Sequence, residues 1–255
     1  MVKNYEILSH KKIYFGQLIK NHIQGIAIVQ VMVAVCGIIV LNVPSLIRGR
    51  EEWKGDITVA HAGGQIGKET YTNSPEAIHK NYEKGHRTFE IDMVLTSDNK
   101  LACIHDWDVD FQKGRELGVA PNSEEFLAYP IQGKYTAILF EDLCKIMNEY
   151  PDMWLVTDTK YDGGSEIRLE FEEMVRVVEE LGMESVLDRV VVQIYNEGMY
   201  DKVRAIYPFQ SWIFTLYQRW NGDLDDFKEI VRFCVRNDIQ NITMNKVRVS
   251  TEVWK

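Results

Sequence analysis

The sequence predicts an α/β fold built on parallel strands. Short apolar runs alternate with longer stretches of helical periodicity, and this alternation is typical of helices that connect parallel strands. Polar residues follow several of the strand candidates, and in a barrel of parallel strands the carboxyl ends form the active face. The strand candidates are residues 57–60, 88–95, 100–104, 153–158, 189–195, 212–217 and 241–244. An eight-stranded barrel needs one strand more, and the chain stops at Lys255.

Helices are expected between these strands. Residues 74–84 offer a capping serine, a proline in the first turn and Gly85 after the end. The strongest amphipathic pattern covers residues 165–181 and is ended by Gly182. Further helices are predicted at residues 140–150, 199–206 and 224–235.

Two connections are of another kind. The turn at residues 97–99 is too short to hold a crossover helix, so the strands on either side of it are expected to form a hairpin or an irregular pair. Residues 107–137 show no clean period and are expected to cross one face of the domain as a long cover.

The N-terminal part contains an uncharged apolar segment at residues 23–47, rich in Ile, Val, Ala and Leu. A bilayer-spanning helix needs about 20 such residues, so a single transmembrane signal-anchor is expected here. A buried core helix rarely lacks charge over this length, and no small-x-small cleavage site suggests a removed signal peptide. Slightly more lysines and arginines precede the segment than follow it. This places residues 1–22 in the cytoplasm and, after a connector at residues 48–56, the barrel domain at 57–255 outside the cell membrane.

Composition limits the function classes. The chain has 255 residues with a formal net charge of -9, enough for one large domain and an appendage. The acidic excess argues against a nucleic-acid partner, which a basic patch would attract. The four cysteines include no Cys-x-x-Cys pair, so their spacing fits neither a zinc site nor a disulfide framework, and they are expected to be buried thiols.

The candidate site lies between two histidines. His61 and His105 each follow a strand candidate, and Glu90 and Asp92 lie two residues apart on the strand between them. Residues two apart on a strand point to one face, where two carboxylates repel each other unless a cation neutralises them. Two histidines can supply an acid and a base near neutral pH. This pattern predicts a site that cleaves phosphodiesters.

Structural alternatives exist for each of these residues. A single histidine after a strand is more often structural than catalytic, and an isolated Glu-x-Asp can be an exposed strand face. The two histidines in this order around the carboxylate pair favour function. Asp158 and Lys160 follow a later strand and can also be read as a pair that neutralises itself. Trp107 either walls the pocket or packs in the core.

These residues resemble the glycerophosphodiester phosphodiesterase family, which is related to phosphatidylinositol-specific phospholipases C. The family pattern is His-Arg-Gly, Asn-Thr, Gly, Glu-x-Asp, Thr-x-Asp-Gly, His-Asp and Glu-x-Lys. The chain has, in the same order, His61-Ala-Gly, Asn73-Ser, Gly85, Glu90-x-Asp92, Thr96-x-Asp98, His105-Asp106 and Asp158-x-Lys160. The resemblance covers most of residues 57–160.

The resemblance implies a TIM-type (β/α)8 barrel, here without its last strand, that hydrolyses a phosphodiester with a divalent metal, Ca²⁺ or Mg²⁺. By position, His61 and His105 would be the general acid–base pair. Glu90, Asp92 and Asp158 would be the metal ligands. The predicted substrate-binding residues are Lys160, Asn73 and Trp107.

Three departures from the family pattern leave a second hypothesis open. Ala62 replaces the arginine that helps bind phosphate, Asp158 is one methylene shorter than the family's glutamate, and the chain stops before the strand with a Trp-Thr-Val-Asn-like run. The first hypothesis is a membrane-anchored, metal-dependent phosphodiesterase acting on glycerophosphodiesters or related lipid headgroups, through direct water attack or a cyclic intermediate. The alternative is a catalytically inactive barrel of the same family that serves as a membrane-tethered binding or structural module.

Overall fold

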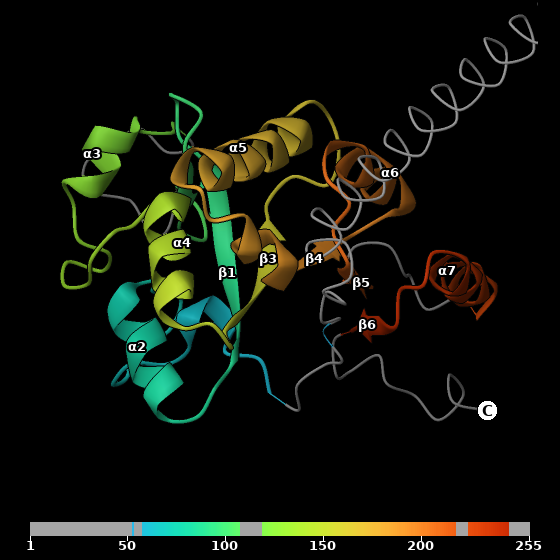
Figure 1. Ribbon diagram of the computed structural model, residues 1–255, viewed down its shortest axis with the longest axis horizontal. Coiled ribbons are helices and arrows are strands. Elements are labelled where there is room, and N and C mark those ends of the chain that lie inside the picture. Colours follow the sequence, from blue (N-terminus) through green and yellow to red (C-terminus); the bar gives the residue numbers. More distant parts are fainter. Residues whose placement is uncertain (1–52, 54–57, 108–118, 218–223, 245–255) are drawn as a thin grey trace, which may run out of the picture. The chain divides into compact units, whose positions relative to one another are not determined.

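The computed structural model describes residues 53, 58–107, 119–217 and 224–244, all within the unit Glu51–Lys255 (Figure 1). Six strands form one sheet in the order β2-β1-β3-β4-β5-β6. Their bounds are β1 Thr88–Leu95, β2 Leu101–Cys103, β3 Trp154–Thr159, β4 Val190–Ile194, β5 Ser211–Thr215 and β6 Asn241–Thr243. From β1 through β3, β4 and β5 to β6, neighbouring strands run parallel.

Helices connect the parallel strands. They are α2 Pro75–Glu83, α3 Ser123–Leu127, α4 Phe140–Glu149, α5 Glu166–Leu181, α6 Glu197–Ile206 and α7 Leu224–Arg236, with 3-10 turns η1 His61–Gly63 and η2 Glu184–Arg189. Figure 1 shows α4, α5 and α6 following one another around the strands. The order of strands and helices confirms the predicted α/β fold with a parallel sheet.

Local signals explain where the predicted helices begin and end. Ser74 caps α2 by accepting a hydrogen bond from the Ala77 N–H, with Pro75 at the first helical position. Gly182 ends α5 in the left-handed conformation, with φ 62° and ψ 37°. The predicted hairpin is also confirmed, because β2 pairs antiparallel with the last residues of β1.

Two predictions need correction. The strand predicted at residues 57–60 is reduced, in the described part, to one parallel bridge between Ala60 and Phe89. Thr58 and Val59 lie outside any strand, and the backbone turns into η1 directly after Ala60. The cover predicted at residues 107–137 contains a short capped helix, α3, with Asn122 and Glu125 in a reciprocal capping box.

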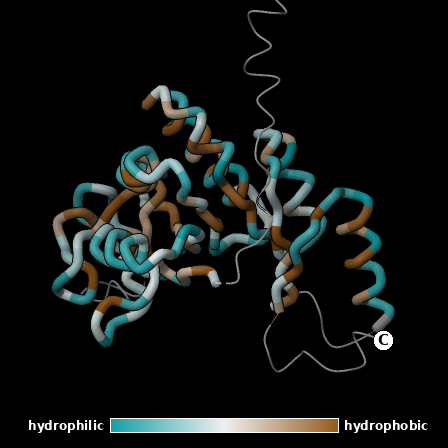
Figure 2. The backbone as a smooth tube through the Cα atoms, turned by 60° about the horizontal axis from the view of Figure 1, so that its bottom comes forward, coloured by the Kyte–Doolittle hydropathy of each residue, from teal (hydrophilic) through white to brown (hydrophobic). Residues whose placement is uncertain are grey.

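The sheet has an apolar outer face and an inner face of two layers. Phe89, Ile91 and Met93 of β1 pack outward into the core with residues of α4, α5 and α6. The inner face begins with an apolar layer of Trp53, Val156, Val191 and Ile213. Figure 2 shows hydrophobic segments along the strands and alternating character along the helices. The inner side chains that follow along the strands are polar, and they form the candidate site.

Trp53 closes the inner layer from the segment predicted as the connector. Its backbone N–H donates to the Ser211 hydroxyl at 3.0 Å, and its indole N–H donates to the Thr88 hydroxyl at 3.1 Å. Thr88 and Ser211 are the first residues of β1 and β5. Trp53 therefore covers the amino-terminal end of these strands.

The apolar segment at residues 23–47 lies outside the described residues. Where the structure does describe the chain, none of its helices has both the length and the apolar character to cross a bilayer. The three described cysteines, Cys103, Cys144 and Cys234, are buried free thiols, as the sequence predicts.

Glu170 is a buried acid in the core side of α5, and it gives a stability prediction. Its side chain is 0% exposed, and neither carboxylate oxygen has a hydrogen-bond partner among the described residues. Burial, and then the charge of Asp158, raise the pKa of Glu170 to about 9. The folded protein therefore keeps a proton that the unfolded chain releases between about pH 4.5 and 9, and stability falls as pH rises through this window.

Glu170→Gln is expected to remove this penalty. At pH 8 the free energy of unfolding should rise by about 2 kcal/mol, with little change at pH 4.5, as measured by urea denaturation at both pH values. Glu173→Gln is the matched control on the same helix, because Glu173 is paired with Arg176 at 2.6 Å and should lose stability when neutralised. Equal effects of Glu170→Gln at both pH values would contradict a protonated Glu170.

Candidate active site

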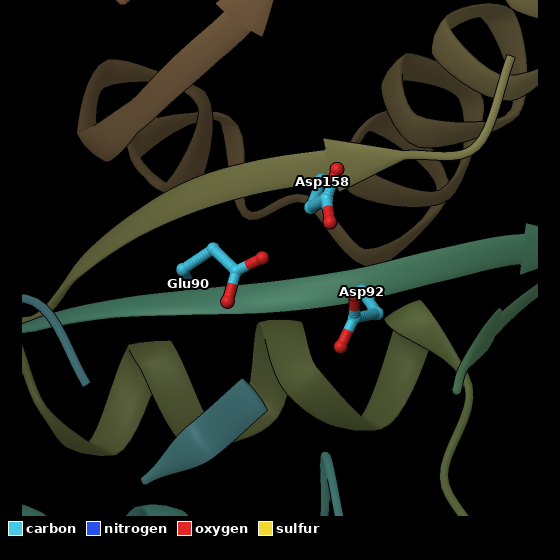
Figure 3. Close-up of side chains that lie close together, drawn as sticks. All are labelled: Glu90, Asp92 and Asp158. Atoms are coloured by element: carbon cyan, nitrogen blue, oxygen red, sulfur yellow. The ribbon is translucent and has the colours of Figure 1, made fainter. Parts of the chain in front are cut away.

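Three carboxylates converge on the inner face of the sheet. Glu90 and Asp92 project from β1, and Asp158 lies beside Asp92 in the register of β1 and β3 (Figure 3). One oxygen of each lies within 4.8 Å of the others. Glu90 and Asp92 are buried, and Asp158 is half-buried. The structure thus brings together the three metal ligands that the sequence predicts.

The loop that carries His61 is fixed to the strands and to α2. Ala62 adopts left-handed angles, φ 50° and ψ 40°, which turn its N–H onto Glu90 Oε2 at 2.8 Å. Asn81 of α2 donates to the carbonyl groups of Gly63 and Gln65 from below. A Cβ at Gly64 would lie 2.5 Å from Asn81 Nδ2, so only glycine allows this close approach.

Asn73 joins this loop to Asp92. Its N–H donates to the Ala62 carbonyl at 3.0 Å, and its side-chain amide donates to Asp92 Oδ2 at 3.0 Å. The Asp92 N–H donates back to Asn73 Oδ1 at 3.0 Å. Asn73 is 1% exposed, so it holds the His61 loop and Asp92 together, while its contact with a substrate stays a prediction.

Lys160 bridges two of the carboxylates. Its ammonium donates to Asp92 Oδ1 at 2.5 Å and to Asp158 Oδ2 at 2.7 Å. Burial disfavours the charge of Lys160, but Asp158 and Asp92 outweigh this effect and raise its pKa. Burial of Asp158 also opposes its ionisation, and Lys160 again outweighs it, so the pKa of Asp158 is lowered. Asp158 and Lys160 therefore do neutralise each other, and their ion pair is part of the candidate site.

The pKa of Glu90 responds most strongly to burial and to this concentration of negative charge. Burial, followed by the charges of Asp92 and Asp158, raises the pKa of Glu90 to about 9. Without an added cation, Glu90 is therefore protonated at neutral pH. A divalent cation would favour the ionised form, and three carboxylate oxygens are the donors that Ca²⁺ and Mg²⁺ prefer. The described residues fit such an ion.

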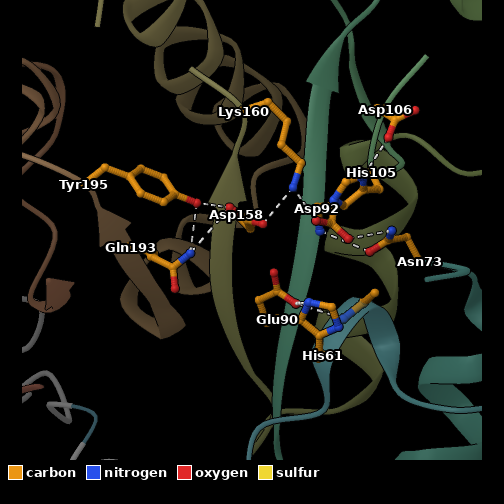
Figure 4. A network of polar contacts seen from close by, with 11 residues as sticks. His61, Asn73, Glu90, Asp92, His105, Asp106, Asp158, Lys160, Gln193 and Tyr195 are labelled. Atoms are coloured by element: carbon orange, nitrogen blue, oxygen red, sulfur yellow. Dashed lines mark hydrogen bonds and ion pairs between the residues drawn. The ribbon is translucent and has the colours of Figure 1, made fainter. Parts of the chain in front are cut away.

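The two histidines lie beside the carboxylates (Figure 4). His61 Nε2 lies 3.7 Å from Glu90 Oε2, and His105 Nδ1 is hydrogen-bonded to Asp106 Oδ2 at 2.8 Å. Their side chains are 54% and 40% exposed, so both can be reached by a substrate. The ring of Tyr71 contacts both imidazoles edge-on, with centroids 4.8 Å from His61 and 5.4 Å from His105.

Three residues of the site are not among those predicted from the sequence. Tyr71 sits in the loop before Asn73 with a left-handed φ of 59°, an unusual conformation for a bulky residue. Gln193 on the inner side of β4 and Tyr195, directly after the end of β4, both contact Asp158 (Figure 4). A polar Gln193 within the apolar run of β4 is a sequence signal for that contact, while nothing in the sequence marks Tyr71.

Trp107 lies in a second apolar cluster. Its ring packs edge-on against Phe126, with centroids 5.6 Å apart, next to Val94, Ile104 and Ile131. This is the core packing that the sequence leaves open as one alternative. Its role in substrate binding stays a prediction.

Comparisons with known proteins find similarity in structure and not in sequence. No protein-family model matches the chain, and no curated protein matches it. Solved structures are similar. One from Galdieria sulphuraria, described as a candidate glycerophosphodiester phosphodiesterase, is 18% identical with a TM-score of 0.61 over 76% of each chain. A phosphodiesterase from Oleispira antarctica, solved with the product sn-glycerol-3-phosphate, is 13% identical with a TM-score of 0.58 over 76% of each chain.

A glycerophosphodiester phosphodiesterase from Parabacteroides distasonis is 16% identical with a TM-score of 0.54, over 73% of this chain and 81% of that one. At such identities, the similarity establishes the fold. The described part of the chain therefore has the α/β fold of solved glycerophosphodiester phosphodiesterases.

Proposed function

We propose that this chain is a member of the glycerophosphodiester phosphodiesterase family that hydrolyses glycerophosphodiesters, or related lipid headgroup phosphodiesters, with a bound Ca²⁺ or Mg²⁺. The observation that carries the proposal is the convergence of Glu90, Asp92 and Asp158 within 4.8 Å on one face of the parallel strands β1 and β3, next to His61 and Lys160. The similar fold of solved phosphodiesterases supports it. We also propose that the sheet belongs to a TIM-type barrel.

The residues of the site have separate roles in this proposal. A cation held by Glu90, Asp92 and Asp158 would offset charge on the phosphoryl oxygens. Lys160 adds a second positive charge beside the same carboxylates, which is the role that Ala62 cannot fill in place of arginine. One histidine removes a proton from the attacking hydroxyl or water, and the other donates a proton to the leaving alkoxide. Asp106 fixes the orientation of His105 by the contact with Nδ1.

Hydrolysis of a small panel tests the proposal. The full chain in detergent is assayed on glycerophosphocholine, glycerophosphoethanolamine, glycerophosphoinositol and phosphatidylinositol, with Ca²⁺, with Mg²⁺ and with EDTA. We expect release of glycerol phosphate from the glycerophosphodiesters, or of a phosphomonoester from phosphatidylinositol, that requires one of the two metals and is lost in Glu90→Ala. Activity that persists in EDTA and in Glu90→Ala would sink the assignment of the site.

The inactive module is the second candidate, and one observation favours it. Ala62 is 0% exposed and its backbone is held by hydrogen bonds on both sides, so this position supplies no cation to the phosphate. A folded chain that binds metal and glycerophosphodiesters but turns over no member of the panel would support this candidate.

We propose further that residues 23–47 anchor the chain in the cell membrane as a single span, with the domain outside. The support is the uncharged apolar composition of the segment and the charge difference across it. The anchored chain should stay in the membrane pellet after an alkaline carbonate wash. Protease added to intact cells should degrade the domain, and a protected domain would contradict this orientation.

A further inference from the structure

Each carboxylate of the candidate metal site is held at one oxygen by a neutral donor. The Ala62 N–H donates to Glu90 Oε2 at 2.8 Å, and the Asn73 amide donates to Asp92 Oδ2 at 3.0 Å. Asp158 Oδ1 accepts a hydrogen bond from the Tyr195 hydroxyl and lies 3.4 Å from Gln193 Nε2. Of the three remaining oxygens, Asp92 Oδ1 and Asp158 Oδ2 accept hydrogen bonds from the Lys160 ammonium. A positive charge is therefore already stabilised between them.

Tyr195 is placed firmly enough to orient Asp158. Its side chain is 8% exposed, and its hydroxyl accepts a hydrogen bond from Gln193 Nε2 at 3.2 Å. Gln193 is itself anchored to β3, because its N–H donates to the Thr157 hydroxyl at 3.2 Å. Figure 4 shows Tyr195 and Gln193 together on the side of Asp158 that faces away from Asp92.

The phenol contacts the carboxylate and not the cation position. Burial, followed by the charge of Asp158, raises the pKa of Tyr195, so the phenol keeps its proton and remains a donor. The hydrogen bond from Tyr195 to Oδ1 fixes the plane of the Asp158 carboxylate and turns its Oδ2 towards Asp92. Hydrogen bonds of this kind to metal-binding carboxylates raise metal affinity by limiting their freedom.

We propose that Tyr195, supported by Gln193, is a positioning residue that presents Asp158 Oδ2 to a divalent cation. This rests on the proposed function only in requiring that the three carboxylates bind metal. It assigns β4 a part in the site that neither the sequence motifs nor the histidine pair indicates.

Metal titration without substrate tests the proposal. The full chain in detergent is titrated with CaCl₂ and with MgCl₂ by isothermal calorimetry. Tyr195→Phe removes one hydroxyl and keeps the ring, and we expect its Kd for the metal to rise about 10-fold. Tyr200→Phe is the matched control, because Tyr200 is a buried tyrosine of α6 whose hydroxyl meets Arg204 at 3.1 Å, and its metal affinity should equal the wild type.

A double-mutant cycle shows whether Tyr195 acts through Asp158. In the Asp158→Asn background, Tyr195→Phe should change the Kd less than 2-fold, because the carboxylate that it positions is gone. Melting curves in EDTA confirm that each variant is folded. If Tyr195→Phe does not fold, Gln193→Leu replaces it, with an expected rise in Kd of about 3-fold.

The outcomes separate the two proposals. An unchanged Kd in folded Tyr195→Phe, or the same loss in the Asp158→Asn background, overturns the role of Tyr195 and leaves the phosphodiesterase proposal standing. A wild-type chain that binds neither metal overturns both. A wild-type chain that binds metal, with the loss confined to Tyr195→Phe and Gln193→Leu, supports the positioning role even if no substrate is turned over.

Discussion

Replacing His61 or His105 by alanine is expected to lower kcat for glycerophosphodiester hydrolysis by about 10²- to 10⁴-fold at saturating metal. Both imidazoles are exposed, and neither is a member of the acidic group that could hold the ion. Their loss should therefore remove proton transfer and leave metal binding largely in place. Initial rates with glycerophosphocholine, together with metal titration of each variant, measure the two effects separately.

An activated substrate should tell which histidine is the acid. The p-nitrophenolate of a p-nitrophenyl phosphodiester is a stable anion and can leave without receiving a proton. The variant that lacks the general acid should therefore recover most of its rate with this ester. The variant that lacks the base should not recover. His79→Ala is the matched control. His79 Nδ1 is hydrogen-bonded to the Tyr150 hydroxyl at 2.7 Å, away from the carboxylates, so this variant should keep full activity. A loss below 10-fold in both His61→Ala and His105→Ala would contradict their catalytic role.

Much of the candidate site could be predicted because its residues occur at short, fixed spacings along strands. The two-residue spacing of Glu90 and Asp92 determines that they share a face, whatever the rest of the fold does. Asp158 was placed with them by the family resemblance, and the parallel register of β1 and β3 gives the physical reason. The alternating helices and strands predicted the parallel sheet in the same way.

The remaining contacts depend on pairings that local sequence does not encode. Tyr195 meets Asp158 because Val191 of β4 is in register with Val156 of β3, and a shift of one residue would turn it to the outer face. Tyr71 reaches both histidines through a left-handed backbone that is stabilised by its surroundings and not by its own preference. The strand predicted at residues 57–60 ends directly before η1, as the sequence indicates, but among its described residues only Ala60 pairs with β1. An apolar run does not reveal how many of its residues pair with a neighbouring strand.

Metal affinity is expected to rise with pH up to about pH 9. Glu90 has a pKa of about 9 in the site without a cation, so below that pH the ion must displace a proton to bind all three carboxylates. The folded pKa is raised, so the protonated form dominates at low pH, and the observed affinity should increase up to 10-fold for each pH unit between 6 and 8. Calorimetry at pH 6, 7 and 8 measures the change. The same titrations in buffers of different ionisation enthalpy should count close to one released proton.

Glu90→Gln separates this proton from other sources of pH dependence. The amide keeps the acceptor for the Ala62 N–H and cannot ionise, so the variant should bind metal more weakly at pH 8 and with an almost flat pH profile. We do not expect Lys160 to be the source of the proton, because Asp158 and Asp92 raise its pKa. A wild-type affinity that is constant from pH 6 to 8 would mean that Glu90 is already ionised, and the carboxylates would then tolerate their mutual repulsion without a metal. A steep profile that disappears in Glu90→Gln would instead show that Glu90 loses its proton only when the divalent cation binds.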